Sequence, residues 1–263
     1  MTVLAVLGVA VWMVSLAGPG QVAASPTAED PVRLQVEVVE IHPHDSQAYT
    51  QGLLWHDGSL FESTGQYGHS SLRRVDRDSG EVVESRSLSA EQFGEGLARV
   101  QDRLIQLTWQ QGEALIWSLD SLKEVGRLGY DGEGWGLCFD GRHLVMSDGT
   151  SKLAFRDPET FDLLRQVVVV MGEGAVGRLN ELECVDGWIY ANVYTTDWIV
   201  RIDPESGRVD ALIDASGLLP ATEMQGVDVL NGIAYDPEKE VFYLTGKLWP
   251  RLFAVRFVEV SGD

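Results

Sequence analysis

Short stretches in which apolar and polar residues alternate dominate the chain, and turn dipeptides such as DG, SG and DP separate them. A period of two is typical of a β-strand that buries one face, and these dipeptides favour tight turns. Beyond the N-terminal region the long 3.6-residue periodicity of amphipathic helices is missing. The pattern therefore predicts an all-β protein.

The strand pairs recur in two alternating classes. The first class consists of "TQGLLWHDGSLFESTG", "GEGLARVQDRLIQLTW", "GWGLCFDGRHLVMSDG", "LNELECVDGWIYANVY" and "LNGIAYDPEKEVFYLTGK". The second class has an aspartate at its turn, at Asp76, Asp120, Asp157 and Asp203. A repeat of about 40 residues with four strands is typical of a propeller blade, so we expect a five-bladed β-propeller with four antiparallel strands per blade. The alternative is a pair of stacked sandwiches, a fold that needs no such repeat.

The fifth repeat ends at "RLFAVRFVEV" without an outer strand, whereas "VRLQVEVVEIHP", before the first repeat, alternates like one. We predict that Leu34 to Ile41 pairs with the strand around Leu252 to Val258, because this closure removes two exposed sheet edges. Residues 33–263 would then form a single domain. A closed ring needs no partner, so we expect a monomer.

The N-terminal region is apolar. The first 24 residues contain no charged side chain, and Val22 and Ala24 fit the −3 and −1 positions of a signal-peptidase site. The sequence predicts a signal peptide over 1–24, a linker over 25–32, and an exported protein, periplasmic or secreted and bacterial. The alternative is an uncleaved membrane anchor, for which the run is short.

The formal net charge of −20 changes the picture of possible partners. A polyanion would be repelled, so nucleic acid is disfavoured, whereas a cationic peptide N-terminus is tolerated. The two cysteines, Cys138 and Cys184, differ by one position when "GLCF" is aligned with "ELEC". Strict alternation would point them to opposite faces of neighbouring strands, which predicts two free thiols.

Aligned repeats place two rings of residues at one mouth of the propeller channel. The first strands contribute Gln51, Glu95, Trp135, Asn180 and Asn231. The ends of the second strands contribute Gly65, Trp109, Gly149, Tyr194 and Lys247. A few polar groups among aromatic walls are typical of a small-ligand pocket, and we expect Gly94 and Gly96 to leave room for that ligand beside Glu95. The alternative is a solvated channel.

The motifs "HDSQAYTQGLLW", "FGEGLARV", "EGWGLCFDGRHLVMSDGT", "RLNELECVDGWIYANVYTTD" and "VLNGIAYDPEKEVFYLTGKLWP" resemble the glutamine cyclotransferases of the plant and bacterial type. The resemblance runs from about Val36 to Phe257. It implies a five-bladed propeller that converts the N-terminal glutamine of peptides or proteins into pyroglutamate and releases ammonia, with neither a cofactor nor a catalytic metal.

The resemblance also implies roles for individual residues. Glu95 of "FGEGL" matches the family's catalytic glutamate, and Phe93 precedes it as a pocket wall. The other positions that match site residues are Gln51, Trp109, Trp135, Asn180 and Lys247. Tyr49 and Tyr194 stand where the family often has phenylalanine and tryptophan, so the aromatic pocket is expected to persist with altered depth or preference.

These residues suit an intramolecular attack of the substrate's α-amine on its own γ-carboxamide. Glu95 would act first as base and then as acid, and Asn180 and Lys247 would donate to the oxyanion. Aromatic side chains would hold the substrate curled.

Other chemistries fit less well. A metal-dependent lactonase or sugar-acid hydrolase could use Glu95, Asn180 and Asn231 as ligands, but an ammonium group such as Lys247 is unusual at a cation site. A non-enzymatic binding propeller is the other alternative. His42 and His44 lack a third ligand at a zinc spacing, and we interpret them as surface-loop residues.

Overall fold

The computed structural model describes residues 30–260, so the predicted signal peptide and most of the predicted linker lie outside the described residues. Regular structure in the described chain consists of strands and one short 3₁₀ helix, η1 (Ala221–Glu223), which confirms the all-β prediction. Over residues 30–260, no helix has the length and apolar character needed to cross a membrane.

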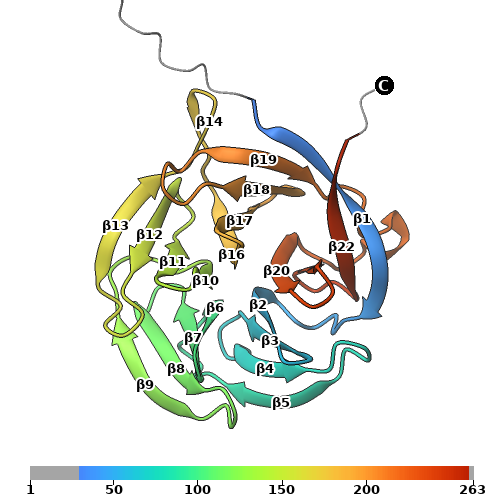
Figure 1. The fold of residues 1–263 in the computed structure, drawn as a ribbon. Coiled ribbons are helices and arrows are strands. Elements are labelled where there is room, and N and C mark those ends of the chain that lie inside the picture. The colour runs from blue at the N-terminus through green and yellow to red at the C-terminus, as the bar shows by residue number, and fades with distance from the viewer. Residues whose placement is uncertain (1–29, 261–263) are drawn as a thin grey trace, which may run out of the picture.

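Sheets that are antiparallel except for one strand pairing surround a central axis, an arrangement typical of a β-propeller (Figure 1). Three sheets have four strands each. The first contains β2 (Thr50–His56), β3 (Ser59–Thr64), β4 (Ser71–Val75) and β5 (Val82–Ser87). The second contains β6 (Gly94–Val100), β7 (Arg103–Thr108), β8 (Glu113–Ser118) and β9 (Glu124–Gly129). The third contains β10 (Leu137–Phe139), β11 (Leu144–Ser147), β12 (Lys152–Arg156) and β13 (Leu163–Val168).

The remaining large sheet has eight strands in the order β16-β17-β18-β19-β1-β22-β21-β20. One half contains β16 (Leu179–Val185), β17 (Trp188–Val193), β18 (Trp198–Ile202) and β19 (Val209–Asp214). The other half contains β20 (Leu230–Asp236), β21 (Val241–Gly246), β22 (Arg251–Glu259) and β1 (Val32–Pro43). A small hairpin of β14 (Val170–Met171) and β15 (Gly174–Ala175), which the repeat pattern does not predict, forms a separate sheet.

Strand β1 joins the two ends of the chain. It pairs antiparallel with β22, from Leu34 opposite Glu259 to Pro43 opposite Arg251, which confirms the predicted closure. Its first residues also pair in parallel with β19, from Val32 opposite Ala211 to Gln35 opposite Asp214. This second pairing, which the repeat pattern does not predict, merges two four-stranded units into one sheet (Figure 1).

Glycines let the inner strands approach one another closely. A Cβ on Gly96 would lie 2.4 Å from the backbone nitrogen of Leu137, and one on Gly136 would lie 2.0 Å from the backbone oxygen of Asn180. A Cβ on Gly94 would lie 2.7 Å from the backbone oxygen of Thr64. The prediction that the glycines beside Glu95 admit a ligand is therefore wrong, because neighbouring backbone fills the space over both of them.

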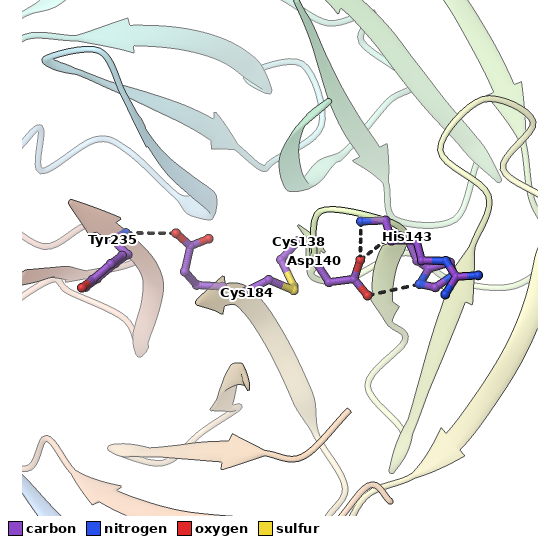
Figure 2. The surroundings of a disulfide bond; sticks show 7 residues. Cys138, Asp140, His143, Cys184 and Tyr235 are labelled. Carbon is purple, nitrogen blue, oxygen red and sulfur yellow. Dashed lines mark hydrogen bonds and ion pairs between the residues drawn. A yellow bond between two sulfur atoms is a disulfide. The ribbon is translucent and has the colours of Figure 1, made fainter. Parts of the chain in front are cut away.

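Cys138 on β10 and Cys184 on β16 form a disulfide, with their Cα atoms 5.5 Å apart (Figure 2). The prediction of two free thiols is therefore wrong. It assumed that opposite faces of neighbouring strands do not meet. Neighbouring sheets pack face to face, so Cys138 and Cys184 both reach the core cluster that contains Leu182. Glu183, in contrast, points the other way and accepts from the backbone nitrogen of Tyr235.

The interpretation of His42 and His44 as surface-loop residues is also wrong. Their side chains are only 10% and 5% exposed, because the end of β1 packs into the ring. His44 Nε2 lies 3.1 Å from Glu62 Oε1 on β3, and its Nδ1 lies 2.7 Å from the backbone oxygen of Trp249. His44 therefore belongs to the buried seam where the ring closes.

Candidate active site

A cavity of about 350 Å³ opens among the inner strands. Nine side chains line it: Tyr49, Gln51, Phe93, Glu95, Trp109, Trp135, Asn180, Tyr194 and Lys247. They are the same nine residues that the sequence singles out as site residues. Asn231, a member of the first predicted ring, does not line the cavity, and its amide nitrogen donates to the backbone oxygen of Thr50 at 3.0 Å.

Irregular register at the start of the inner strands positions the polar side chains. The pairing of β2 with β3 shifts between Thr50 and Gly52, that of β6 with β7 between Gly94 and Leu97, and that of β16 with β17 between Leu179 and Leu182. The cavity residues within these irregular stretches are Gln51, Glu95 and Asn180. Because a bulge re-aims side chains and interrupts pairing, it lets each of these inner strands present a polar group at the cavity.

Glu95 is buried, at 4% exposure, and its Oε1 accepts a 2.8 Å hydrogen bond from Gln51 Nε2. Burial raises the pKa of Glu95 well above its usual range. Lys247 opposes that rise and the negative charge of Glu133 adds to it. A buried carboxyl group with a raised pKa in a cavity is typical of functional sites.

Lys247 follows β21 and is buried at 3% exposure. Its Nζ lies 4.9 Å from the ring centre of Tyr49 and 5.0 Å from that of Tyr194, so two aromatic faces hold the ammonium group. Burial lowers the pKa of Lys247, while the negative charges of Glu95 and Asp228 oppose the shift. Among the described residues no carboxylate lies within ion-pair distance of it, which leaves the ammonium donors for a ligand.

Asn180 is 2% exposed, and its Oδ1 has no hydrogen-bond partner within the described chain. Its backbone oxygen, in contrast, accepts a 2.7 Å hydrogen bond from Ser147 Oγ, which fixes the strand. Buried polar atoms are normally paired, so an unpaired amide oxygen in a residue that lines a cavity indicates a position where a ligand donor can bind.

Aromatic rings form the walls in two groups. Phe93 packs edge-on against Trp109, with centroids 5.7 Å apart, and Trp135 packs edge-on against Tyr194 at 5.5 Å. Two members of the second predicted circle of residues are glycines, Gly65 and Gly149, and both lie against these aromatic side chains. A Cβ on Gly65 would lie 2.2 Å from the Phe93 ring, and one on Gly149 would lie 2.7 Å from the Trp135 ring. The two glycines therefore make room for the aromatic walls.

Two carboxylates around the cavity do not feature among the predicted residues. Glu133 accepts hydrogen bonds from both indole nitrogens, of Trp109 at 2.8 Å and of Trp135 at 3.0 Å. Asp228 Oδ2 accepts a 3.1 Å hydrogen bond from the hydroxyl of Tyr49. The sequence carries one signal for Glu133, since "GEGWGL" repeats the glycine-flanked glutamate of "FGEGL". Over residues 30–260, no group of three or more His, Cys, Asp or Glu side chains is placed to hold a metal ion.

Comparison with known proteins identifies the family. A family model described as glutamine cyclotransferase matches residues 10–257. The glutaminyl-peptide cyclotransferase of Arabidopsis thaliana is 40% identical over 233 residues, which cover 86% of this chain and 72% of that protein. The crystal structure of Myxococcus xanthus glutaminyl cyclase superimposes with a TM-score of 0.83 at 41% identity, covering 88% of this chain and 100% of that one. The chain therefore belongs to the glutamine cyclotransferase family.

Proposed function

We propose that the nine-residue cavity carries out the glutaminyl-peptide cyclotransferase activity of the family, with Glu95 as the residue that moves the proton. The observation that carries this proposal is a buried carboxyl group with a strongly raised pKa, beside an unpaired ammonium group and an unpaired amide oxygen. Perturbed groups that converge in a concave, largely apolar pocket are the usual mark of an active site.

The aromatic walls would hold the substrate in the conformation that reacts. The methylenes of an N-terminal glutamine would pack between the Phe93–Trp109 group and the Trp135–Tyr194 group. Holding the α-amine against the γ-carboxamide carbon makes attack more probable without any new bond to the protein. The cavity volume of about 350 Å³ suits one such side chain together with the adjoining backbone.

The chemical steps balance through one proton carrier. The α-amine nitrogen forms a bond to the carbon of the side-chain carboxamide (Cδ), and the carbonyl oxygen takes the negative charge. Glu95 accepts a proton from that nitrogen and delivers it to the amide nitrogen, the carbon–nitrogen bond breaks, and ammonia leaves. A carboxyl group whose pKa is raised above that of an ordinary glutamate suits both transfers.

Two polar groups would bind the substrate's charged and polar atoms. The Lys247 ammonium, which has no carboxylate at ion-pair distance within the described residues, would donate to the developing oxyanion. The unpaired Oδ1 of Asn180 would accept a hydrogen bond from the substrate's amine or amide, while the other end of its amide could donate. Gln51 would keep the Glu95 carboxyl oriented through their 2.8 Å contact.

The finer architecture belongs to the same proposal. We count the two halves of the eight-stranded sheet as separate blades, which gives five blades together with the three four-stranded sheets. On this count residues 33–263 form one domain that acts as a monomer on peptides or proteins with an N-terminal glutamine. A disulfide on the inner strands supports export to an oxidising compartment.

The test is ammonia release from a peptide that begins with glutamine. Glu95→Gln keeps the shape of the side chain and removes the base, so turnover should fall by about 10² to 10⁴-fold while peptide binding persists. Glu91→Gln is the matched control, because Glu91 is exposed in the same segment and should leave turnover unchanged. A folded Glu95→Gln variant with near-parental turnover would remove Glu95 from the mechanism.

A further inference from the structure

Glu133 lies in the loop between β9 and β10, and it connects two walls of the cavity. Its Oε2 accepts hydrogen bonds from Trp109 Nε1 at 2.8 Å and from Trp135 Nε1 at 3.0 Å. Its Oε1 accepts a third, from Gln110 Nε2 at 3.1 Å. Trp109 follows β7 in one sheet and Trp135 precedes β10 in the next, so a single oxygen atom joins two sheets at the cavity.

This arrangement fixes ring orientation. Packing alone leaves a tryptophan free to tilt within its wall, whereas an indole N–H held by a carboxylate has one preferred direction. Each ring also packs on a second aromatic side chain of the cavity, Phe93 for Trp109 and Tyr194 for Trp135. Glu133 therefore contacts one ring of each aromatic pair, Trp109 of the first and Trp135 of the second.

We propose that Glu133 is a positioning residue that sets the separation of Trp109 and Trp135, and with it the fit of the cavity to the glutamine side chain. This inference rests on the proposed function. Glu133 does not line the cavity, so it acts on the substrate only through the two indoles. Hydrogen bonds from Trp135 and Trp109 lower the pKa of Glu133, which keeps it ionised and therefore able to accept from both rings.

The charge of Glu133 has a second, separable consequence. Lys247 and Glu133 are the charged groups that act on the pKa of Glu95, in opposite directions, and the neutral Gln51 amide contacts its carboxyl. Tyr49 and Tyr130, the other titratable groups that interact with Glu95, are uncharged near neutral pH because burial raises the pKa of both. Removing the charge of Glu133 therefore lowers the pKa of Glu95.

Two substitutions separate geometry from charge. Glu133→Asp keeps the charge but withdraws the carboxylate by one methylene, so both indole contacts are lost or displaced. Glu133→Gln keeps an oxygen that can accept both indoles and removes the charge, and the Gln110 amide can turn over to suit the new NH₂ group. Asp131→Asn is the control, because Asp131 is an exposed carboxylate two residues earlier in the same loop.

The measurement is the pH dependence of kcat and KM for a glutamine-initiated peptide, together with the Tm of each variant. We expect Glu133→Asp to raise KM roughly tenfold, the size of a lost charge-assisted hydrogen bond, without moving the acid limb of the pH profile. Glu133→Gln should leave KM within about twofold and shift the acid limb of kcat/KM to lower pH. Asp131→Asn should change neither.

The outcomes are distinguishable. If Glu133 only supported the fold, both variants would have a lower Tm. The rise in KM would then not be confined to Glu133→Asp, nor the shift of the pH profile to Glu133→Gln. The positioning role would be overturned if Glu133→Asp left KM within twofold of the parental value. It would also be overturned if Glu133→Gln raised KM as much as Glu133→Asp does. Parental protein that releases no ammonia would instead overturn the proposed function.

Discussion

Two buried carboxylates in this molecule behave in opposite ways. Glu62, at the seam where the ring closes, and Glu95, in the cavity, are 1% and 4% exposed. Burial raises the pKa of both, but for Glu62 the partners more than offset it, so its pKa is lowered. Its Oε1 lies 3.1 Å from His44 Nε2 and accepts a 2.7 Å hydrogen bond from Thr50 Oγ1. The pKa of Glu95 is raised instead, because its burial is not offset: in the described chain its carboxyl group accepts one hydrogen bond, from Gln51, and Lys247 lies beyond ion-pair distance.

The different partners of Glu62 and Glu95 distinguish a carboxylate that stabilises the fold from one that lines the cavity. At the seam the charges pair with one another, so that the segment after β1, strand β3 and the Trp249 backbone are held together. In the cavity the Glu95 carboxyl group and the Lys247 ammonium form no ion pair, and the hydrogen bond to Glu95 in the described chain comes from the neutral Gln51 amide. Burial by itself therefore does not determine whether a carboxylate supports the fold or the chemistry, whereas its partners do.

The largest expected effect tests this difference directly. Glu62→Ala leaves His44 and Thr50 without their partner in a buried site, and it should lower the free energy of unfolding by about 3–5 kcal/mol. Glu95→Ala removes a group that has a single neutral partner, and it should change that free energy by about 1 kcal/mol or less. Urea unfolding of both variants measures the two values. Equal losses would show that the two carboxylates do not differ as described.

The next effect falls on activity alone. Lys247→Ala should lower kcat/KM by roughly 10²-fold if the ammonium donates to the oxyanion, with no loss in the free energy of unfolding, because a buried unpaired charge costs stability. Steady-state ammonia release and urea unfolding check the two statements. Lys123→Ala, which removes an exposed lysine on the outer side of the ring, serves as control. A large loss of stability without a change in kcat/KM would assign Lys247 to the fold.

The dependence of stability on pH should differ between the two regions. The Glu62 charge raises the pKa of His44 despite burial, so the stability that His44 contributes is complete below its unfolded pKa of about 6.5 and is lost as pH rises through the folded value. The pKa of Glu62 is lowered, so its contribution is lost as pH falls through that value. The raised pKa of Glu95 has the reverse sign, and it should cost stability as pH rises above about 4.5.

Thermal unfolding across this pH range measures these contributions. The Tm of Glu95→Gln relative to the parent should increase as pH rises above about 4.5. His44→Gln should remove the decline of Tm at higher pH that we expect for the parent. Parallel Tm curves for the parent and both variants would contradict the opposite pKa shifts.

The smallest effect concerns a departure from the family pattern. Tyr49→Phe removes the hydroxyl that donates to Asp228 at 3.1 Å but keeps the ring beneath the Lys247 ammonium. One hydrogen bond to a partly exposed carboxylate corresponds to a change in KM of about two- to tenfold, with kcat preserved. Steady-state kinetics on a glutamine-initiated peptide measures it, and a larger loss in kcat would place the hydroxyl in the chemistry rather than at the rim.

Local periodicity was sufficient to predict most of the fold. Alternation and turn residues depend on neighbours along the chain, so the strands and their repeats could be read without knowing the tertiary structure. The pairing of β1 with β22 also followed, because a repeat that lacks its outer strand leaves an edge that another strand must cover. The ring positions of Glu95 and Lys247 came from the same repeats. The parallel pairing of β1 with β19 has no such signal.

Tertiary structure alone decided the features that depend on contacts between distant segments. The packing of two neighbouring sheets face to face brought Cys184 to Cys138, although alternation along each strand does not show which faces meet. The seam buried His44 beside Glu62, and the loop before β10 brought Glu133 to two tryptophans. The sequence alone determined which residues are present and how they alternate. Burial and partners set the sign of a pKa shift and the availability of a charge, and both arise only when the ring closes.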